Sequence, residues 1–144
     1  MEKQPQFPFA PKDFARCLNA TCPRSQNCLR RTAALQDTDE HLFLKVVNPL
    51  RYPKEGEECE LFRSTDKVRM AWGVTHLLDN VPYKEGSLLR NMIINHLGRS
   101  QYYRCFRKER PFSPQDQQTI RLLFRQRGIS EELSFDYYTN EFNW

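Results

Sequence analysis

The number and spacing of the cysteines constrain this chain more than any other feature. Five cysteines occur in 144 residues, and three of them lie in the segment CLNATCPRSQNCLRR, residues 17–31, with the spacing C-x4-C-x5-C. No apolar run approaches the roughly 20 residues of a membrane-spanning helix, and the start MEKQPQFPFAPKDF does not resemble a signal peptide. We therefore expect a cytoplasmic protein. Thiols stay reduced in the cytoplasm, so clustered cysteines indicate a metal site rather than disulfides.

The cysteine spacing predicts a zinc site made of four thiolates. Zinc prefers four tetrahedral ligands, and such sites combine a close group of cysteines with a distant one. The loop KEGEECELF supplies the distant ligand, and arginines near the close group would offset the negative charge of four thiolates. The predicted ligands are Cys17, Cys22, Cys28 and Cys59. The same ligands suit an iron–sulfur cluster, which we rank below zinc. The alternative is that these cysteines are small buried hydrophobic residues, which is our expectation for Cys105.

Charge is distributed unevenly along the chain, whose net charge is +4. Residues 16–31 carry four arginines and no acid, whereas residues 36–60 carry seven acids and three bases, a local balance of −4. Residues 99–127 carry eight bases and two acids, a local balance of +6, and residues 129–144 carry four acids and no base. A basic segment of this kind indicates a polyanionic or acidic partner.

The N-terminal half is predicted to be a small mixed structure around the metal. The proline-rich residues 1–12 are typical of an extended arm that precedes a single compact domain, residues 13–144. Residues 13–63 form the cysteine-rich, zinc-binding part of that domain. This part contains a short helix at residues 28–36. Two short strands, at residues 41–48 and 58–64, are predicted after it. Branched and aromatic content indicates the first of them.

Residues 64–144 are predicted to form a helical part. Apolar spacing predicts four helices, at residues 64–80, 85–98, 99–110 and 134–144. A fifth helix has the clearest start, with Ser113 as N-cap and Pro114 in the first position, and a stop at Gly128. The predicted fold class is therefore mainly α, within the α+β class. A cysteine-rich metal knuckle with one or two short strands precedes a bundle of four to five helices.

The sequence around Gly98 predicts a helix-turn-helix. A helix that ends at a glycine turn, followed by a helix with cationic and hydrogen-bonding side chains, places the second helix in the DNA major groove. Arginine and glutamine suit base contacts, and lysine suits phosphate contacts. The pattern departs from that of repressors at Ile94, where a small residue is usual, and at a turn position that is usually apolar. The alternative is a solvated basic face. The predicted nucleic-acid-binding residues are Arg99, Gln101, Arg104, Arg107 and Lys108.

Several short motifs follow one another in an order that is similar to a known family. They are CLNATCPRSQNCLRR, VVNP, GEECELFR, AWGVTHLLDNVP, LGRSQYYRCFRKERPFSP and FDYYTNEFNW. Together they resemble an uncharacterised family of small cysteine-containing proteins associated with gut Bacteroidetes, which is described only as a domain of unknown function. The resemblance covers nearly the whole chain and implies no activity.

These features predict a zinc-stabilised protein that binds nucleic acid, DNA in preference to RNA, in a regulatory role. The alternative is a non-enzymatic adaptor whose basic helical face binds an acidic protein. We expect neither a membrane partner nor an enzyme. The sequence has no glycine-rich phosphate loop, nucleophile elbow or paired-histidine metal motif. A four-cysteine zinc site also has no open position for a substrate, so it would be structural.

Overall fold

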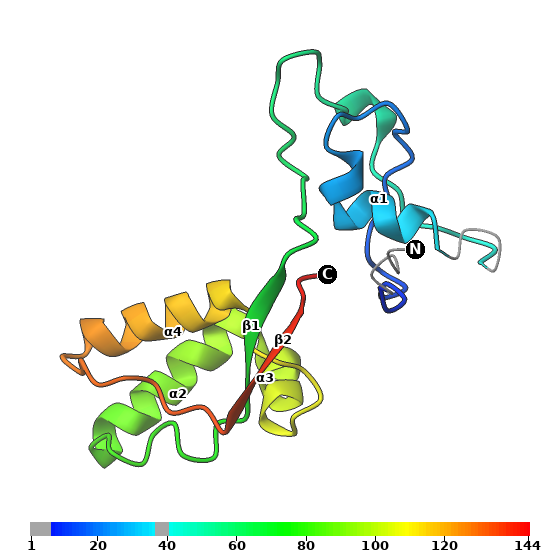
Figure 1. The fold of residues 1–144 in the computed structure, drawn as a ribbon. Coiled ribbons are helices and arrows are strands. Elements are labelled where there is room, and N and C mark those ends of the chain that lie inside the picture. Colours follow the sequence, from blue (N-terminus) through cyan, green and yellow to red (C-terminus); the bar gives the residue numbers. More distant parts are fainter. Residues whose placement is uncertain (1–6, 37–40) are drawn as a thin grey trace. The chain divides into compact units, whose positions relative to one another are not determined.

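The computed structural model describes residues 7–36 and 41–144 and has an α+β fold (Figure 1). The chain forms two compact units: the first is Met1–Asp66 together with Phe142–Trp144, and the second is Lys67–Glu141. Within the described residues there are four α-helices, two 3-10 helices and one antiparallel sheet of two strands. In chain order the elements are η1 (Ser25–Asn27), α1 (Leu29–Ala34), η2 (Pro49–Arg51), β1 (Lys67–Trp72), α2 (Tyr83–Leu97), α3 (Arg99–Phe106), α4 (Pro114–Gln126) and β2 (Tyr137–Phe142).

The first unit has a small hydrophobic core. Its only α-helix in the described residues is α1, which lies within the helix predicted at residues 28–36. Aromatic rings from residues 142–144 complete the core, because Phe142 contacts Phe7 and Trp144 contacts Phe14, with ring centroids 4.7 and 5.4 Å apart. The buried residues of this core are Ala10, Phe14, Leu29 and Ala33.

Two segments of the first unit that we predicted as strands are not strands. Residues 41–48 form only an isolated bridge, in which Val46 pairs with Arg16, and residues 58–64 form only a bridge to the cysteine-rich segment. Branched and aromatic residues favour a strand where they pack on a half-buried sheet. Here the side chains of Leu42 and Phe43 are 96% and 89% exposed, so that packing is missing. Of the predicted arm at residues 1–12, residues 1–6 lie outside the described residues.

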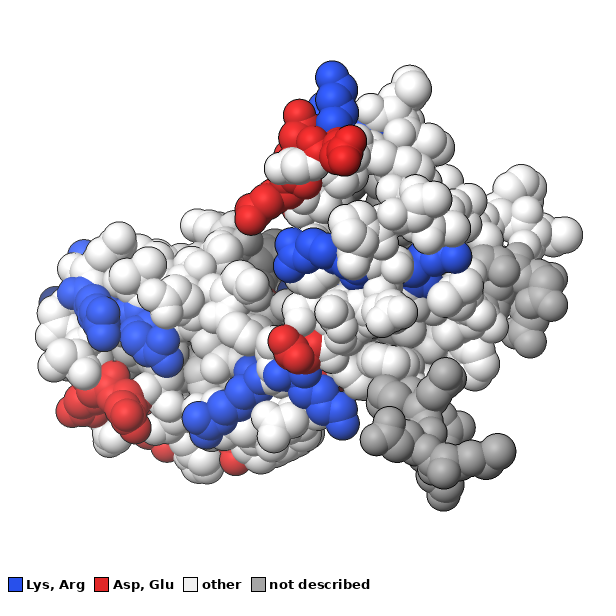
Figure 2. Space-filling view, turned by 45° about the horizontal axis from the view of Figure 1, so that its top comes forward, with Lys and Arg blue, Asp and Glu red and all other residues white. Residues whose placement is uncertain are grey.

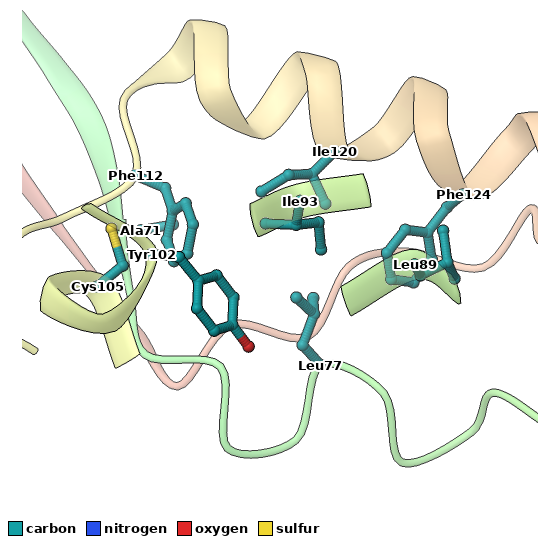
Figure 3. Close-up of a cluster of buried hydrophobic side chains, with 9 residues drawn as sticks. All are labelled: Ala71, Leu77, Leu89, Ile93, Tyr102, Cys105, Phe112, Ile120 and Phe124. Carbon is teal, nitrogen blue, oxygen red and sulfur yellow. The ribbon is translucent and has the colours of Figure 1, made fainter. Parts of the chain in front are cut away.

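The framework of the second unit consists of α2 and α4, which lie side by side and run in opposite directions (Figure 1). Glu85 in the first turn of α2 forms an ion pair with Arg127, directly after α4, with an Nε–Oε2 distance of 2.6 Å. Figure 3 shows Ile93 and Ile120 facing one another between the two helices. The buried cluster around them comprises Ala71, Leu77, Leu89, Ile93, Tyr102, Cys105, Phe112, Ile120 and Phe124.

The helix predicted between its N-cap Ser113 and its stop at Gly128 is confirmed as α4, including its start. The Ser113 side chain accepts a hydrogen bond from the Asp116 N–H at 3.1 Å, and the Asp116 carboxylate accepts one from the Ser113 N–H at 3.3 Å. This reciprocal capping satisfies N–H groups that otherwise lack a partner in a first turn. The helices predicted at residues 85–98 and 99–110 are present as α2 and α3.

Two other segments of the second unit that we predicted as helices contain strands. Residues 64–80 contain β1 and residues 134–144 contain β2, and the two strands pair with each other. In β1, exposed Lys67 and Arg69 alternate with less exposed apolar residues, which is the period of two typical of a strand. The pairing brings Trp72 against β2, where its indole N–H donates to the Thr139 hydroxyl at 2.8 Å. The helical spacing of apolar residues in these segments was therefore misleading.

Replacing Gly73 by alanine should destabilise the second unit. Gly73 follows β1 with a φ of +79°, and an added Cβ would overlap the carboxylate of Asp136. That carboxylate accepts a hydrogen bond from the Thr75 hydroxyl at 2.7 Å and pairs with Lys108 at 3.2 Å, which limits its freedom to move. We expect urea denaturation to show a larger loss of unfolding free energy than the roughly 1–2 kcal/mol of left-handed backbone strain alone.

The matched control for this substitution is Gly128→Ala. Gly128 has a φ of +77°, and a Cβ added there would meet nothing within 4 Å. The control therefore carries the backbone strain without the overlap. Equal losses of unfolding free energy in Gly73→Ala and Gly128→Ala would contradict the role assigned to Asp136.

Candidate functional site

The four predicted metal ligands lie around one cavity in the first unit. Cys17, Cys22, Cys28 and Cys59 all line a space of about 30 Å³. Residues 47–53 and 61–62 contribute further lining residues, among them Val47, Tyr52, Pro53, Leu61 and Phe62. A space of this size has room for a single ion or one or two water molecules, and it is too small for an organic cofactor.

Backbone and arginine hydrogen bonds bring Cys59 to the cysteine-rich segment. The Leu29 N–H donates to the Arg63 carbonyl at 2.7 Å, which joins the start of α1 to the chain that follows Cys59. The Nε of Arg30 donates to the Leu61 carbonyl at 2.8 Å, so a side chain of α1 holds the same segment. These contacts explain how cysteines that are distant in sequence line one cavity.

Arginine side chains place positive charge around the cavity. Burial lowers the pKa of Arg30, as does the charge of Arg63, while the neighbouring cysteines Cys28, Cys59 and Cys17 act in the opposite direction. Arginine stays protonated over the range in which proteins fold. Positive charge of this kind offsets part of the negative charge that four metal-bound thiolates would carry. The arginines that line the cavity are Arg24, Arg30, Arg31 and Arg51.

The cavity cysteines are free thiols, and the structure does not arrange them as a coordination sphere. Among residues 7–36 and 41–144, no group of three or more His, Cys, Asp or Glu side chains is placed so that it could hold a metal ion. Cys28 is buried, and Cys17, Cys22 and Cys59 are partly exposed. Four sulfur donors match zinc chemically, but coordination requires side-chain positions other than those in this structure.

Three of the predicted nucleic-acid-binding residues lie on α3 in the second unit. Arg99 and Arg104 are exposed, and Gln101 is partly buried. The guanidinium of Arg104 donates to the Gln101 side-chain carbonyl at 3.5 Å, and Arg99 lies 5.9 Å from the centre of the Tyr103 ring. The two arginines therefore present their charge to solvent, whereas Gln101 is less accessible.

The other two predicted residues follow α3 and hold carboxylates of the protein. The Nε of Arg107 lies 2.8 Å from Oε1 of Glu109, and the Nζ of Lys108 lies 3.2 Å from Oδ2 of Asp136. Among the described residues, Lys108 is the only one other than glycine with a positive φ, which is 59°. Pairing with a carboxylate reduces the charge that each of these residues offers to a polyanion.

The structure does not show the predicted helix-turn-helix at Gly98. Gly98 alone separates α2 from α3, whereas a helix-turn-helix joins its helices by a turn of about three to four residues. In the view of Figure 2, Lys and Arg side chains form several separate groups, and Asp and Glu side chains adjoin some of these groups.

One exposed surface of the second unit was missed by the sequence analysis. It is the outward side of α4, opposite the buried Ile120 and Phe124. The helix itself was predicted, so counting positions away from these two apolar residues would have found the surface. We call it the α4 face and define it as Gln115, Gln118, Arg121, Leu122, Arg125 and Gln126.

These features define a small α+β protein with a four-thiol cavity in one unit and basic helices in the other. The chain belongs to the family of unknown function DUF6078, whose family model matches residues 1–144. No curated protein and no solved structure matches it. In the part of the chain that the structure describes, no helix is long and apolar enough to cross a membrane.

Cys105 should react with alkylating reagents more slowly than the cavity cysteines. Its side chain is fully buried in the core of the second unit, and burial raises the pKa of its thiol, which leaves little reactive thiolate. Iodoacetamide at about pH 8 with a chelator present, followed by peptide mass spectrometry, should modify the partly exposed Cys17, Cys22 and Cys59 before Cys105. All five cysteines should react in denaturant. Equal rates for Cys105 and Cys22 in the native protein would show that this placement is wrong.

Proposed function

We propose that this is a zinc-stabilised nucleic-acid-binding protein, in which a metal fixes the first unit and the second unit contacts DNA. The observation that carries the proposal is the convergence of four cysteines, Cys17, Cys22, Cys28 and Cys59, on one ion-sized cavity surrounded by arginines. A zinc ion held by four thiolates is closed to substrates, so it supplies stability rather than catalysis.

The small core of the first unit supports a structural metal. Two of its four core residues are alanines, which bury little apolar surface, while the larger side chains of Leu42, Phe43 and Leu50 are exposed. Small units with few buried apolar side chains usually need disulfides or a metal for stability. The five cysteines are free, and a metal on the four cavity thiols would serve as such a staple.

Metal analysis of the protein tests this part of the proposal. Protein purified without added metal should contain one zinc per chain, measured by inductively coupled plasma mass spectrometry. Cys22→Ser should lose the zinc and unfold the first unit, because a structural zinc contributes on the order of 10 kcal/mol in small peptides. Cys105→Ser is the control and should keep the zinc, since Cys105 is buried in the other unit.

Two results would overturn the zinc assignment. One is a wild-type protein without stoichiometric metal, and the other is Cys22→Ser with full zinc content and an unchanged melting temperature. Visible absorption bands in the purified protein would replace zinc by an iron–sulfur cluster on the same ligands.

The charge of the second unit supports binding to nucleic acid. Residues 99–127 carry a local balance of +6, and Arg99 and Arg104 on α3 are exposed. Basic side chains that contact phosphates release counterions, which gives affinity without any particular fold. The proposal therefore does not need a helix-turn-helix at Gly98. An adaptor that binds an acidic protein remains the second candidate for the same basic surface.

Replacing Arg99 and Arg104 together by alanine should weaken binding to duplex DNA. Exposed substitutions usually change stability by no more than about 0.5 kcal/mol, so the fold should persist. Each lost phosphate contact should reduce the slope of log affinity against log salt by about one. Fluorescence anisotropy at several salt concentrations measures both quantities.

Lys45→Ala is a useful control for this experiment. Lys45 is an exposed basic residue of the first unit and does not line the four-cysteine cavity. This variant should bind DNA as the wild type does. If the wild type shows no salt-dependent affinity for DNA or RNA, the nucleic-acid proposal fails and the adaptor takes its place.

A further inference from the structure

The α4 face has a composition that is unusual for a solvated helix surface. Its six residues are three glutamines, two arginines and one leucine, without an acid. Solvated helix faces commonly mix acids and bases, because opposite charges three or four residues apart stabilise the helix. The only acid of α4 is Asp116, which caps the helix and lies 3.3 Å from Arg110 and 3.5 Å from His96. The Asp116 carboxylate is thus occupied by groups of the second unit, and the outward side of α4 stays cationic.

The two arginines of this face differ in their ion pairing from the basic residues that follow α3. Among the described residues, neither Arg121 nor Arg125 forms an ion pair, and Arg121 donates only to the side-chain carbonyl of Gln118, at 3.2 Å. Arg107 and Lys108, by contrast, each hold a carboxylate. The α4 face therefore offers full positive charge to an anionic partner.

The helix that carries this face is held rigidly. Ile120 and Phe124 are buried in the core, and the side-chain amide of Gln117 donates to the Arg69 and Phe112 carbonyls, both at 2.9 Å. Phe112, just before the helix, forms a bridge to Ala71 of β1. A surface that is fixed in this way loses little entropy on binding, which suits it to recognition.

From these observations we infer that the α4 face enters the major groove of duplex DNA and reads base edges. The inference rests on the proposed nucleic-acid binding and assigns that reading to residues outside α3. Arginine pairs with guanine and glutamine with adenine by two hydrogen bonds each, and Leu122 can contact a thymine methyl group. From Gln115 to Gln126 the face spans about 16 Å, because an α-helix rises about 1.5 Å per residue.

The chemistry of the face selects B-form DNA over other nucleic acids. Single strands are usually bound by aromatic side chains on which bases stack, and the α4 face has none. Double-stranded RNA has a deep and narrow major groove that side chains do not read. A helix about 10–12 Å in diameter fits the major groove of B-form DNA, which is about 12 Å wide.

Two double variants of the full chain separate base reading from charge. Gln115→Ala with Gln118→Ala removes hydrogen-bonding groups without changing charge, and alanine favours the helix. Arg121→Ala with Arg125→Ala removes hydrogen-bonding groups and positive charge together. The probe is a pool of random-sequence DNA duplexes, from which each protein selects bound sequences for sequencing, followed by anisotropy titrations across salt concentrations.

We expect the wild type to enrich a short motif of about five base pairs, since that length of duplex matches the helix at about 3.4 Å per pair. The glutamine variant should lose part of the motif and keep its salt slope. The arginine variant should lose roughly tenfold or more in affinity for each base contact, and its salt slope should fall wherever an arginine also touches phosphate.

The possible failures are distinguishable. If the wild type binds neither DNA nor RNA, both this inference and the proposed function are wrong. If it binds and Arg99→Ala with Arg104→Ala weakens binding while both α4 variants bind as the wild type does, the proposed function holds and the α4 inference is overturned. Binding without any selected motif, or stronger binding to single strands or RNA, also overturns it.

Discussion

The pairing of β1 with β2 is the constraint on which the second unit depends. The two strands bracket α2, α3 and α4, so the three helices must fold within the length of chain that the pairing closes. Trp72 and Tyr137 stack across the pair, with ring centroids 5.9 Å apart. Beyond the pair, Asp136 bonds to the turn that follows β1 and to Lys108. A two-stranded sheet is marginal alone, so packing on the helices and these contacts stabilise each other.

The two units differ in what stabilises them. The second buries nine residues in one cluster, among which Ile93, Phe112 and Ile120 are almost fully buried. The core cluster of the first has four buried residues, and this unit relies on aromatic rings from residues 142–144 and on hydrogen bonds of Arg30 to backbone carbonyls. A cavity lined by four thiols in the weaker unit is where a metal would add most to stability.

What could be predicted from the sequence depended on how local the signal was. Ser113, Pro114 and Asp116 specify the start of α4 within four residues, and that helix is present as predicted. The strands β1 and β2 depend on pairing across the whole unit, which apolar spacing within one segment does not reveal. Residues 64–80 were therefore predicted as a helix, although Gly73 and the alternation of charged and apolar residues in β1 favoured a strand.

The candidate site shows the same limit. Chemical type was enough to group the four cysteines, because few roles explain so many thiols in a polar segment, and they do line one cavity. Which basic residues are available to a partner depends on ion pairs with distant carboxylates, such as that of Lys108 with Asp136, and spacing does not predict these. The length of the turn at Gly98 likewise became known only from the structure.

The position of residues 142–144 has a consequence for biosynthesis. Proteins emerge from the ribosome from the N-terminus onward, and domains generally fold as units as they emerge. Residues 7–66 leave the ribosome first, but the rings of Phe142 and Trp144 that complete their core follow only after all of the second unit. The first unit is therefore synthesised early, but its core is completed only at the end of translation. Until then, Phe7 and Phe14 lack their contacts with Phe142 and Trp144.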